Sequence, residues 1–386
     1  EGMRPLFFIP FLSQMTLPYQ KIKDMIQGKN PMIFSKSEIS EKQIQPASLD
    51  LTLGDRVYRT SSSFLPKPNE SIWGILQKRT LYDFELKPET ILEPNSSYII
   101  PLNEYVDLAP GIYAYVNPKS SIGRVGLFVR LLVDGTPRFD YIPSGYKGQL
   151  YLEVIPLDFV VKIHPNLACN QVRFRTTGEY RAREADIRLA HTKYGVLFTQ
   201  EGISVPQDDL VISDGGLMLT VDLESRDVVG YRAKHDTTKA IDLGLIDEYE
   251  PSDFWEPIAR PQSGELILVP NDFYLLSSIE RITFPPMFAG EMASYDPSSG
   301  EMRSHYAGFF DPGWGFGEAG EGAGTPAVLE VRAHNVPFRL TRRQIICTMV
   351  YENMLEQPQE LYSSGLGSSY TGTGPKLSKH FKQTWN

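Results

Sequence analysis

Apolar residues along the chain come in short runs of Val, Ile, Leu, Tyr and Phe that are separated by turns. The turns are rich in glycine and proline, of which the chain has 31 and 29. Short apolar runs punctuated in this way are typical of an all-β protein. Helical spacing is scarce, and its clearest instance is 19–26, where Ile22, Met25 and Ile26 fall on one face. The pattern predicts a mostly β fold with a few short helices.

Three short motifs recur in the same order at a nearly constant spacing, which predicts a tandem duplication of a β domain. The matching pairs are 94–98 with 270–274, 152–154 with 329–331, and 118–121 with 296–299, at offsets of 176, 177 and 178 residues. We expect a first barrel with an N-terminal helical segment over 1–185. A second barrel with a glycine-rich C-terminal arm should cover 186–386, with the boundary close to the polar run 176–184.

Charge and cysteine content exclude several classes of protein. With 38 Lys and Arg against 47 Asp and Glu, the net charge is −9. This charge disfavours a broad nucleic-acid surface but leaves room for a local pocket for a small anion. Two cysteines, Cys169 and Cys347, are too few for a disulfide scaffold or an all-cysteine metal site. The zinc-deaminase signature, H-x-E followed by P-C-x-x-C, is missing from the sequence.

No apolar run approaches the ~18–20 residues that a membrane helix needs. The short run 6–12 is broken by Pro10 and makes a poor signal peptide. We therefore expect a cytoplasmic protein that acts on a small molecule.

The segment 117–127 (NPKSSIGRVGL) has the composition of an anion-binding turn. Pro118 should end a strand, and Ser120 and Ser121 suit the start of a short helix, where free N–H groups and hydroxyls collect. Arg124, one turn later, would point back over that end and complete a phosphate site. A capped short helix with a solvated arginine fits the same residues equally well.

Two related strands each carry a carboxylate at their centre. In 148–154, strand alternation places the leucines and the valine on one face and Glu153 on the other. In the second copy, Glu330 and Arg332 share a face. A carboxylate midway along an apolar strand is either a general base in a pocket or a structural ion-pair partner. The residues alone leave both interpretations open.

The segment 310–314 (FDPGW) predicts a turn with an aromatic residue after it. Asp311 could cap this turn or contact a ligand, and the first-repeat counterpart 142–146 (IPSGY) has no acid at that place. The glycine-rich stretch 363–379 is either a flexible tail or a mobile flap over phosphates, which its serines, tyrosine and lysines would suit. The six histidines show no ligand spacing and predict no metal site.

Several of these segments match the motifs of one known family. They are 45–54 (QPASLDLTLG), Ser120-Ser121-x-x-Arg124-x-Gly126, Asp311-Pro312-Gly313-Trp314, the two Leu-Glu-Val strands, 343–346 (RQII), and Tyr370-x-Gly372-x-Gly374-Pro375. In combination they resemble the dCTP deaminase branch of the dUTPase-like superfamily, in a long two-domain bacterial form. The matches span both halves of the chain.

The resemblance implies a distorted β-barrel of jelly-roll character in each half, usually assembled as a trimer with active sites between barrels. It implies zinc-independent hydrolysis of dCTP to dUTP and ammonia in pyrimidine deoxynucleotide metabolism. A strand glutamate would shuttle protons and activate water for attack at C4, a role that needs a carboxylate with a tuned pKa. Mg²⁺ normally accompanies the triphosphate, and no protein-bound metal is expected.

The expected site residues follow from the matched motifs. The catalytic residues are Glu330 and Glu153, the phosphate-binding residues are Ser120, Ser121, Arg124, Tyr370, Lys376 and Lys379, and the base- and sugar-binding residues are Asp311, Trp314 and Ala307. The expected partner is a deoxynucleoside triphosphate, with no nucleic acid and no membrane. A homo-oligomer, a trimer or a dimer, is expected as well.

Each half lacks part of the family pattern. The first half has the intact phosphate motif 120–124 but no acid in its turn. The second half has Asp311, Glu330 and the C-terminal arm, but Arg303 follows 298–299 one residue late. We therefore expect one composite site, in which the first half grips phosphates and the second half handles the base and closure.

Three alternatives remain open at this stage. A dUTPase would use a turn aspartate to activate water against the α-phosphate, and Asp311 stands where that base would be. A bifunctional enzyme would deaminate and then cleave the triphosphate. A non-catalytic nucleotide-binding barrel would explain the incomplete motifs. The residues determine neither the oligomeric state nor the preference for dCTP over dCMP or CTP.

Overall fold

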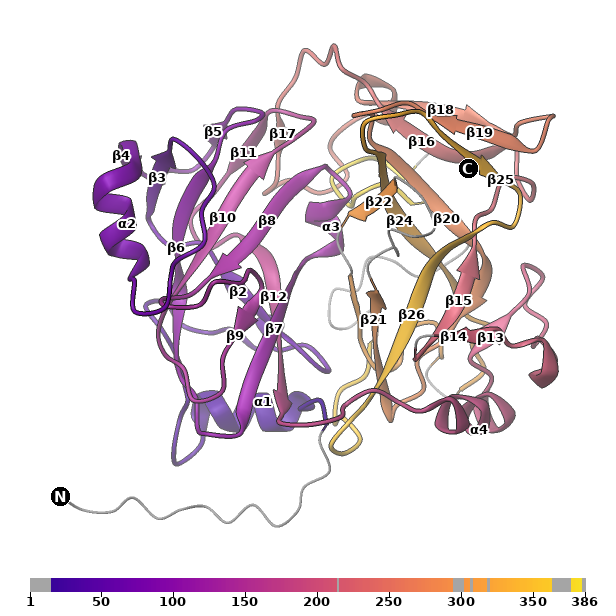
Figure 1. The fold of residues 1–386 in the computed structure, drawn as a ribbon, viewed down its shortest axis with the longest axis horizontal. Helices are drawn as coiled ribbons and strands as arrows, with labels where there is room; N and C mark the ends of the chain where they lie inside the picture. The colour runs from indigo at the N-terminus through magenta and orange to yellow at the C-terminus, as the bar shows by residue number, and fades with distance from the viewer. Residues whose placement is uncertain are drawn as a thin grey trace.

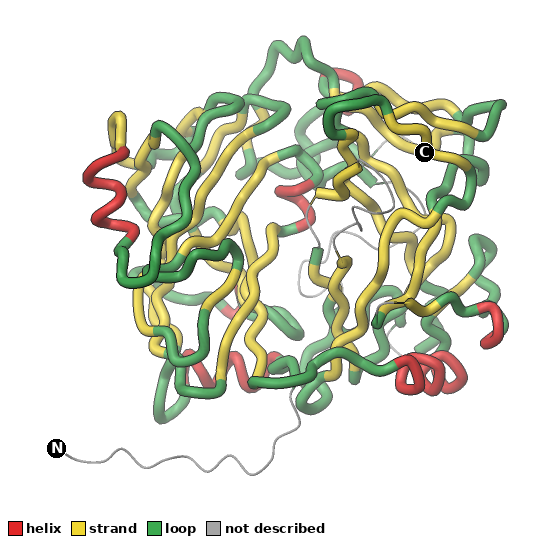
Figure 2. The backbone as a smooth tube through the Cα atoms, viewed as in Figure 1, coloured by secondary structure: helices red, strands yellow, loops and turns green. Residues whose placement is uncertain are grey.

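The computed structural model describes residues 15–213, 215–293, 302–305, 308–317, 320–362 and 376–383. Within these ranges, the strands form two barrel-like sets of sheets that lie side by side (Figure 1). Strands fill both halves, whereas the helices lie mostly at the outside (Figure 2). The predicted all-β fold is confirmed.

Three sheets build the first half. The large sheet contains β1 (Ile33–Ser35), β3 (Arg56–Thr60), β4 (Thr80–Glu85), β6 (Tyr98–Asp107), β8 (Leu127–Leu132) and β10 (Lys147–Pro156). Its order is β4-β3-β6-β10-β8, and β1 also pairs with β6. The second sheet contains β2 (Leu49–Thr52), β12 (Ala168–Thr176), β7 (Ile112–Pro118) and β9 (Tyr141–Ile142), in that spatial order. The third pairs β5 (Thr90–Leu92) with β11 (Val161–Ile163).

The second half repeats this arrangement. Its large sheet contains β13 (Leu197–Phe198), β16 (Val228–Ala233), β18 (Trp255–Ala259), β20 (Tyr274–Ile282), β22 (Met302–His305) and β24 (Thr325–Ala333). The order is β18-β16-β20-β24-β22, and β13 also pairs with β20. The second sheet contains β14 (Ile212–Ser213), β15 (Gly216–Thr220), β26 (Ile345–Asn353), β21 (Phe288–Ala293) and β23 (Phe309–Phe310), in that order. The third pairs β19 (Glu265–Leu268) with β25 (Phe338–Thr341).

The two large sheets correspond strand by strand, which confirms the predicted duplication. Their registers agree as well, because Val154 of β10 lies opposite Tyr98 and Val331 of β24 lies opposite Tyr274. Glu153 and Glu330 therefore occupy the same position in the two copies. The repeat seen as short motifs in the sequence is a repeat of sheet topology.

The two halves share core residues across their junction. Strand β17 (Ile241–Asp242) belongs to the second half of the sequence but pairs in parallel with β11 of the first half. Phe254, Trp255 and Phe381 pack into the same hydrophobic cluster as the first-half core. The hydrophobic core of the first half thus includes residues from beyond position 185. The domain boundary at 185/186 stays a prediction.

Short helices lie between the strands along the chain. They are α1 (Tyr19–Gln27), α2 (Ile72–Arg79), α3 (Ser120–Gly123) and α4 (Glu184–Tyr194), with 3-10 turns η1 (Glu41–Gln43), η2 (Gln207–Asp209) and η3 (Pro251–Asp253). The predicted helix at the N-terminal end is α1, which buries Ile22 and Met25. The expected short helix after Pro118 is α3, and it lies at the junction of the two halves (Figure 1).

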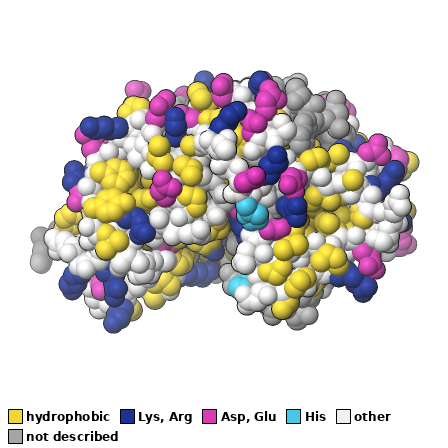
Figure 3. Space-filling view, turned by 90° about the horizontal axis from the view of Figure 1, so that it is seen from above, with side chains coloured by type: hydrophobic (Ala, Val, Ile, Leu, Met, Phe, Trp, Pro, Cys, Tyr) yellow, Lys and Arg dark blue, Asp and Glu magenta, His cyan; other side chains and the backbone are white. Residues whose placement is uncertain are grey.

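The described helices all lack the length and apolar character that crossing a membrane would require. On the face seen from above, Lys and Arg side chains are interspersed with Asp and Glu side chains (Figure 3). Among the described residues visible on that face, positive and negative side chains are therefore mixed and do not gather into a broad basic surface.

Candidate active site

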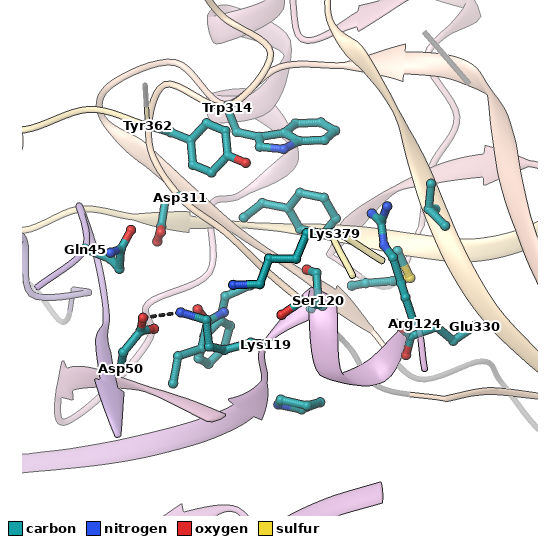
Figure 4. Close-up of a pocket in the computed structure, with 18 of the residues that line it drawn as sticks. Gln45, Asp50, Lys119, Ser120, Arg124, Asp311, Trp314, Glu330, Tyr362 and Lys379 are labelled. Atoms are coloured by element: carbon teal, nitrogen blue, oxygen red, sulfur yellow. Dashed lines mark hydrogen bonds and ion pairs between the residues drawn. The ribbon is translucent and has the colours of Figure 1, made fainter. Parts of the chain in front are cut away.

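A pocket lies between the two halves of the chain, and both halves line it (Figure 4). The first half contributes Lys42, Gln45, Asp50, Pro118, Lys119, Ser120, Ser121, Arg124 and Gln171. The second half contributes Met292, Gly308, Phe309, Phe310, Asp311, Trp314, Val328, Glu330, Tyr362 and Lys379. Expected catalytic, phosphate-binding and base-binding residues thus meet in one place, although their roles remain predictions.

Glu330 lies in the middle of β24 with only 6% of its surface exposed. Among the residues that the structure describes, its Oε2 atom is buried without a hydrogen-bond partner. Burial raises the pKa of this carboxyl well above its usual value, while the positive charges of Arg124 and Arg332 act in the opposite direction. Such a group exchanges its proton at a higher pH than a surface glutamate, as a general acid–base catalyst in a pocket requires.

Gly123, at the end of α3, packs directly against the Glu330 carboxyl group. A Cβ on Gly123 would lie 2.6 Å from Cδ of Glu330 and even closer to both carboxylate oxygens. The backbone of Gly123 has no positive φ that would itself demand glycine. Glycine is therefore required here for space, because the first half must approach the acid of the second half very closely.

Arg124 follows α3 and ties the C-terminal segment to it. Its Nη1 atom donates a hydrogen bond of 2.7 Å to the carbonyl oxygen of Lys376. Ser378 reinforces the contact, since its hydroxyl donates to the carbonyl oxygen of Ser121 at 2.7 Å. The C-terminal segment 376–383 is thus docked on the helix that carries the serine motif, and it brings Lys379 into the pocket.

Asp311 occupies the turn that follows β23, as the sequence predicts. Its carbonyl oxygen accepts a hydrogen bond of 3.1 Å from the N–H of Trp314, which closes the turn. The Trp314 ring meets Phe310 edge-on, with 4.9 Å between ring centroids. Burial raises the pKa of Asp311, and the nearby positive charge of Arg173 opposes that shift. The turn therefore presents a buried carboxylate and an indole to the pocket.

Lys119 and Asp50 of the first half and Lys379 of the second half gather in one part of the pocket. Lys119 forms an ion pair with Asp50 of β2. Lys379 extends toward this pair through the middle of the pocket (Figure 4). Burial and the charge of Lys119 lower the pKa of Lys379. Because two ammonium groups share this confined space, an anionic ligand between them would relieve their repulsion.

Family models cover nearly the whole chain. The model for the N-terminal domain of 2'-deoxycytidine 5'-triphosphate deaminase matches residues 13–178, and the model for the C-terminal domain of the same family matches 184–381. The chain belongs to the dCTP deaminase family. The family and the class of enzyme expected from the sequence are confirmed.

Solved and curated dCTP deaminases show two lengths. The crystal structure of the Agrobacterium tumefaciens enzyme is 38% identical with a TM-score of 0.81, and the match covers 88% of this chain and 99% of that one. The dCTP deaminase of Acidianus ambivalens is 31% identical over 33% of this chain and 66% of its own length. The "dCTP deaminase, dUMP-forming" of Persephonella marina is 28% identical over 42% of this chain and 83% of its own. The Acidianus and Persephonella relatives are therefore about half as long as the present chain.

Glu153 does not line the pocket, although it is the counterpart of Glu330. It is fully buried inside the first half, where it accepts hydrogen bonds of 2.9 Å from the hydroxyls of Ser63 and Ser97. Burial raises the pKa of Glu153, and the two serines act in the opposite direction. Hydroxyls thus satisfy Glu153 within its own barrel, and of the two acids Glu330 is the one that lines the pocket. The catalytic role expected of Glu153 stays a prediction.

Three expected phosphate- or base-binding residues are not placed in the pocket wall. Tyr370 and Ala307 lie outside the described residues. Lys376 takes part through its carbonyl oxygen, as the acceptor for Arg124, and it is not one of the lining residues. Burial and the charge of Arg124 lower the pKa of its ammonium group.

Several lining residues were not singled out from the sequence. They are Lys42, Gln45, Asp50, Lys119, Gln171 and Tyr362. Gln45 and Asp50 lie in the matched segment 45–54, and Lys119 precedes the serine motif, so nearness to these motifs was the available clue. Gln171 and Tyr362 lie in no matched segment, and only the fold brings them in. Across the described ranges, no three His, Cys, Asp or Glu side chains gather as metal ligands.

Proposed function

We propose that this chain hydrolyses dCTP to dUTP and ammonia in the pocket between its halves, with Glu330 as the general acid and base. One observation carries the proposal. The carboxyl group of Glu330 is buried in the pocket wall, its pKa is raised, and Lys119, Arg124 and Lys379 line the same pocket and can bind an anion. The site therefore pairs a proton-exchanging acid with cations for a triphosphate.

The reaction needs two proton transfers that one carboxyl group can perform. Ionised Glu330 accepts a proton from water while the water oxygen bonds to C4 of cytosine, and it passes that proton to the ring nitrogen N3. It then moves the remaining hydroxyl proton to the amino group, so that the C4–N bond breaks and ammonia leaves. This route uses no zinc ion, since the carboxylate itself activates water.

Charge and shape suggest how the rest of the pocket divides its tasks. Arg124 lies close enough to Glu330 to influence its pKa, so its charge acts at the acid as well as on phosphate. Asp311 and Trp314 offer a hydrogen-bond acceptor and an aromatic surface, which suit a sugar hydroxyl and a ring. We assign Ser120, Ser121, Lys379 and Lys119 to the triphosphate.

Mg²⁺ bound to the triphosphate is part of the proposal. Oδ1 of Asp50 is buried and, within the described part of the chain, lacks a hydrogen-bond partner. A carboxylate oxygen of this kind suits Mg²⁺ or one of its water ligands. Asp50 would hold the ion, which would neutralise phosphate charge when bound.

Assembly and location complete the proposal and rest on the family resemblance. We propose that the chain forms a trimer or a dimer and works in the cytoplasm. Sedimentation velocity of the purified protein tests the first statement, and fractionation of the source cells tests the second.

Incubation with dCTP tests the function directly. We expect ammonia and dUTP in equal amounts from the wild type, and a loss of about 100- to 10,000-fold in kcat for Glu330→Gln. Glu153→Gln is the matched control, because it removes the counterpart acid from the same strand position of the other barrel. Full activity in E330Q, or its loss in E153Q, would contradict the assignment. Binding of dCTP without turnover would identify a non-catalytic barrel.

A bifunctional enzyme is the second candidate, and Asp311 favours it. A buried carboxylate in the pocket could activate water against the α-phosphate, and the Persephonella relative is named dUMP-forming. Such an enzyme would release pyrophosphate and dUMP after ammonia. Measuring pyrophosphate separately from ammonia decides between the two, and in a bifunctional enzyme Asp311→Asn should lower the ratio of pyrophosphate to ammonia.

A further inference from the structure

Strand β12 of the first half sends three side chains across the junction. Because alternate residues of a strand share a face, Gln171, Arg173 and Arg175 project together. Gln171 lines the pocket, and Arg175 pairs with Glu352 and Glu291 of the second half. Arg173, between them, is fully buried.

The guanidinium of Arg173 holds the stretch that carries Asp311. Nη2 donates to Oδ1 of Asp311 at 3.1 Å and to the carbonyl oxygen of Phe310 at 3.2 Å. Nη1 donates to the carbonyl oxygen of Gly290 at 2.9 Å, which lies opposite Phe310 in the sheet. The cation also lies 4.0 Å from the centroid of the Phe309 ring. One side chain of the first half thus grips both strands at the edge of the pocket.

Charge gives the contact a second effect. Burial raises the pKa of Asp311, and the closest opposing charge is that of Arg173. The charges of Asp50 and Lys119 act on Asp311 more weakly and in opposite directions. Without Arg173, burial would favour the protonated carboxylic acid, which is a poorer hydrogen-bond acceptor for a ligand.

The pair occurs once in the duplicated chain. The sheet registers make Val350 the counterpart of Arg173, since Val350 lies opposite Glu291 as Arg173 lies opposite Tyr115. The counterpart of Asp311 is Pro143, which follows β9 as Asp311 follows β23. The arginine and the aspartate are therefore present together where the pocket forms and absent together from the equivalent positions. A general need of the barrel for a buried arginine would not produce this pattern.

We propose that Arg173 is a positioning residue for the reaction, which orients the Asp311 carboxylate toward bound dCTP from the opposite half of the chain. The inference rests on the proposed function of the pocket. Arg173 does not line the pocket itself, so it acts on the substrate through Asp311, whose strand edge it also holds.

A double-mutant cycle between Arg173→Met and Asp311→Asn tests the proposal. We expect R173M to lower kcat/KM for dCTP by about 100-fold, since a small misplacement of a ligand-binding group has effects of this size. In the D311N background, R173M should add less than about threefold, because the residue through which it acts is already neutral. The low-pH limb of kcat/KM should move to higher pH in R173M and stay in place in R173M/D311N relative to D311N.

Arg175→Met is the matched control, because Arg175 is an equally buried arginine on the same face of β12 and contacts no pocket-lining residue in its ion pairs. We expect R175M to lose thermal stability but to keep kcat/KM near that of the wild type. Arg173→Lys should recover part of the activity, since an ammonium keeps the charge but cannot serve all three acceptors at once. It also provides a folded variant if R173M is unstable.

Calorimetric binding of dCTP separates this inference from the proposed function. Full activity in E330Q would contradict the catalytic role proposed for Glu330. Weaker binding of dCTP to R173M than to R175M would still support positioning by Arg173. Equal binding in these two variants, or equal effects of R173M with and without D311N, would overturn the inference.

Discussion

The backbone of Gly123 lies against the carboxyl group of Glu330, so closely that a single added methyl group would overlap both of its oxygens. The contact joins α3 of the first half to β24 of the second half. It fixes the distance between the serine motif and the proposed catalytic acid. The geometry of the proposed catalytic site therefore depends on how the two barrels dock.

Gly123→Ala should damage catalysis more than folding. The new Cβ would lie 2.6 Å from Cδ of Glu330, so either the acid or α3 must move. We expect kcat to fall by about 10- to 100-fold, with a loss of about 1–3 kcal/mol in unfolding free energy from overpacking. Steady-state kinetics and denaturant unfolding measure the two effects.

Gly74→Ala is the control for that experiment. Gly74 lies in α2, and its Cβ would meet only the hydroxyl of Ser71, at 3.1 Å. We expect unchanged kcat in G74A, since α2 contributes nothing to the pocket. Wild-type kcat in G123A would show that catalysis does not depend on the close contact between Gly123 and Glu330.

Glu330→Gln should make the protein more stable than the wild type at high pH, although it removes most of the activity. Burial raises the pKa of Glu330 in the folded state, so the folded protein binds this proton more tightly than the unfolded chain. Stability from this group is therefore fully present below the unfolded pKa and is lost as pH rises through the folded pKa. The loss is about 1.4 kcal/mol for each pH unit that separates the two pKa values.

Thermal unfolding of wild type and E330Q across the pH range measures this effect. The variant should gain on the wild type as pH rises and lose its advantage below the pKa of an unfolded glutamate. A constant difference in Tm at all pH values would indicate that the carboxyl is not held in its neutral form.

Glu352 should give the fold the opposite dependence on pH. Although burial alone would raise its pKa, the charges of Arg175 and Arg173 lower the pKa of Glu352 below its usual value. The hydroxyl of Thr16 also donates to Oε2 of Glu352, at 2.7 Å. Because the folded-state pKa is depressed, the stabilisation is complete above the unfolded pKa and is lost as pH falls through the folded pKa.

Glu352→Gln removes that dependence and weakens the junction. We expect a loss of about 3–5 kcal/mol at neutral pH, because two buried arginines lose their common partner. The difference from the wild type should shrink as pH falls. Urea unfolding at several pH values measures it, and a loss in E352Q that is independent of pH would contradict the role assigned to this carboxylate.

Local motifs in the sequence predict much of the site but not its assembly. The Leu-Glu-Val strands and the FDPGW turn are continuous in the sequence, so their elements and the repeat could be recognised. Glu153 and Glu330 both lie between a leucine and a valine, so the strand motif by itself does not distinguish them. The tertiary structure distinguishes the two acids. Ser63 and Ser97 donate hydrogen bonds to Glu153 within the first barrel, whereas α3 of the first barrel packs against Glu330 of the second.

Contacts between the two halves could not be predicted from the sequence for the same reason. Arg173 lies 138 residues from Asp311 along the chain, and no spacing rule relates them. The alternation of Gln171, Arg173 and Arg175 marks one polar face of a strand, but a polar face usually indicates solvent. Here the face is buried against the second barrel, and only the docked structure shows it.

Arg124 should set the pH at which Glu330 becomes active. Its positive charge opposes the effect of burial on the pKa of Glu330, so its removal should raise that pKa further. In the proposed mechanism the ionised carboxylate activates water, so the low-pH limb of kcat should move to higher pH in Arg124→Gln. KM for dCTP should rise as well, because one cation of the pocket is lost.

Arg124→Lys is the control, because it keeps the positive charge. The low-pH limb of kcat should stay near its wild-type position in this variant, with a smaller rise in KM. Profiles of kcat against pH for the three proteins decide the matter, and a limb that stays in place in R124Q would show that the arginine serves the phosphates alone.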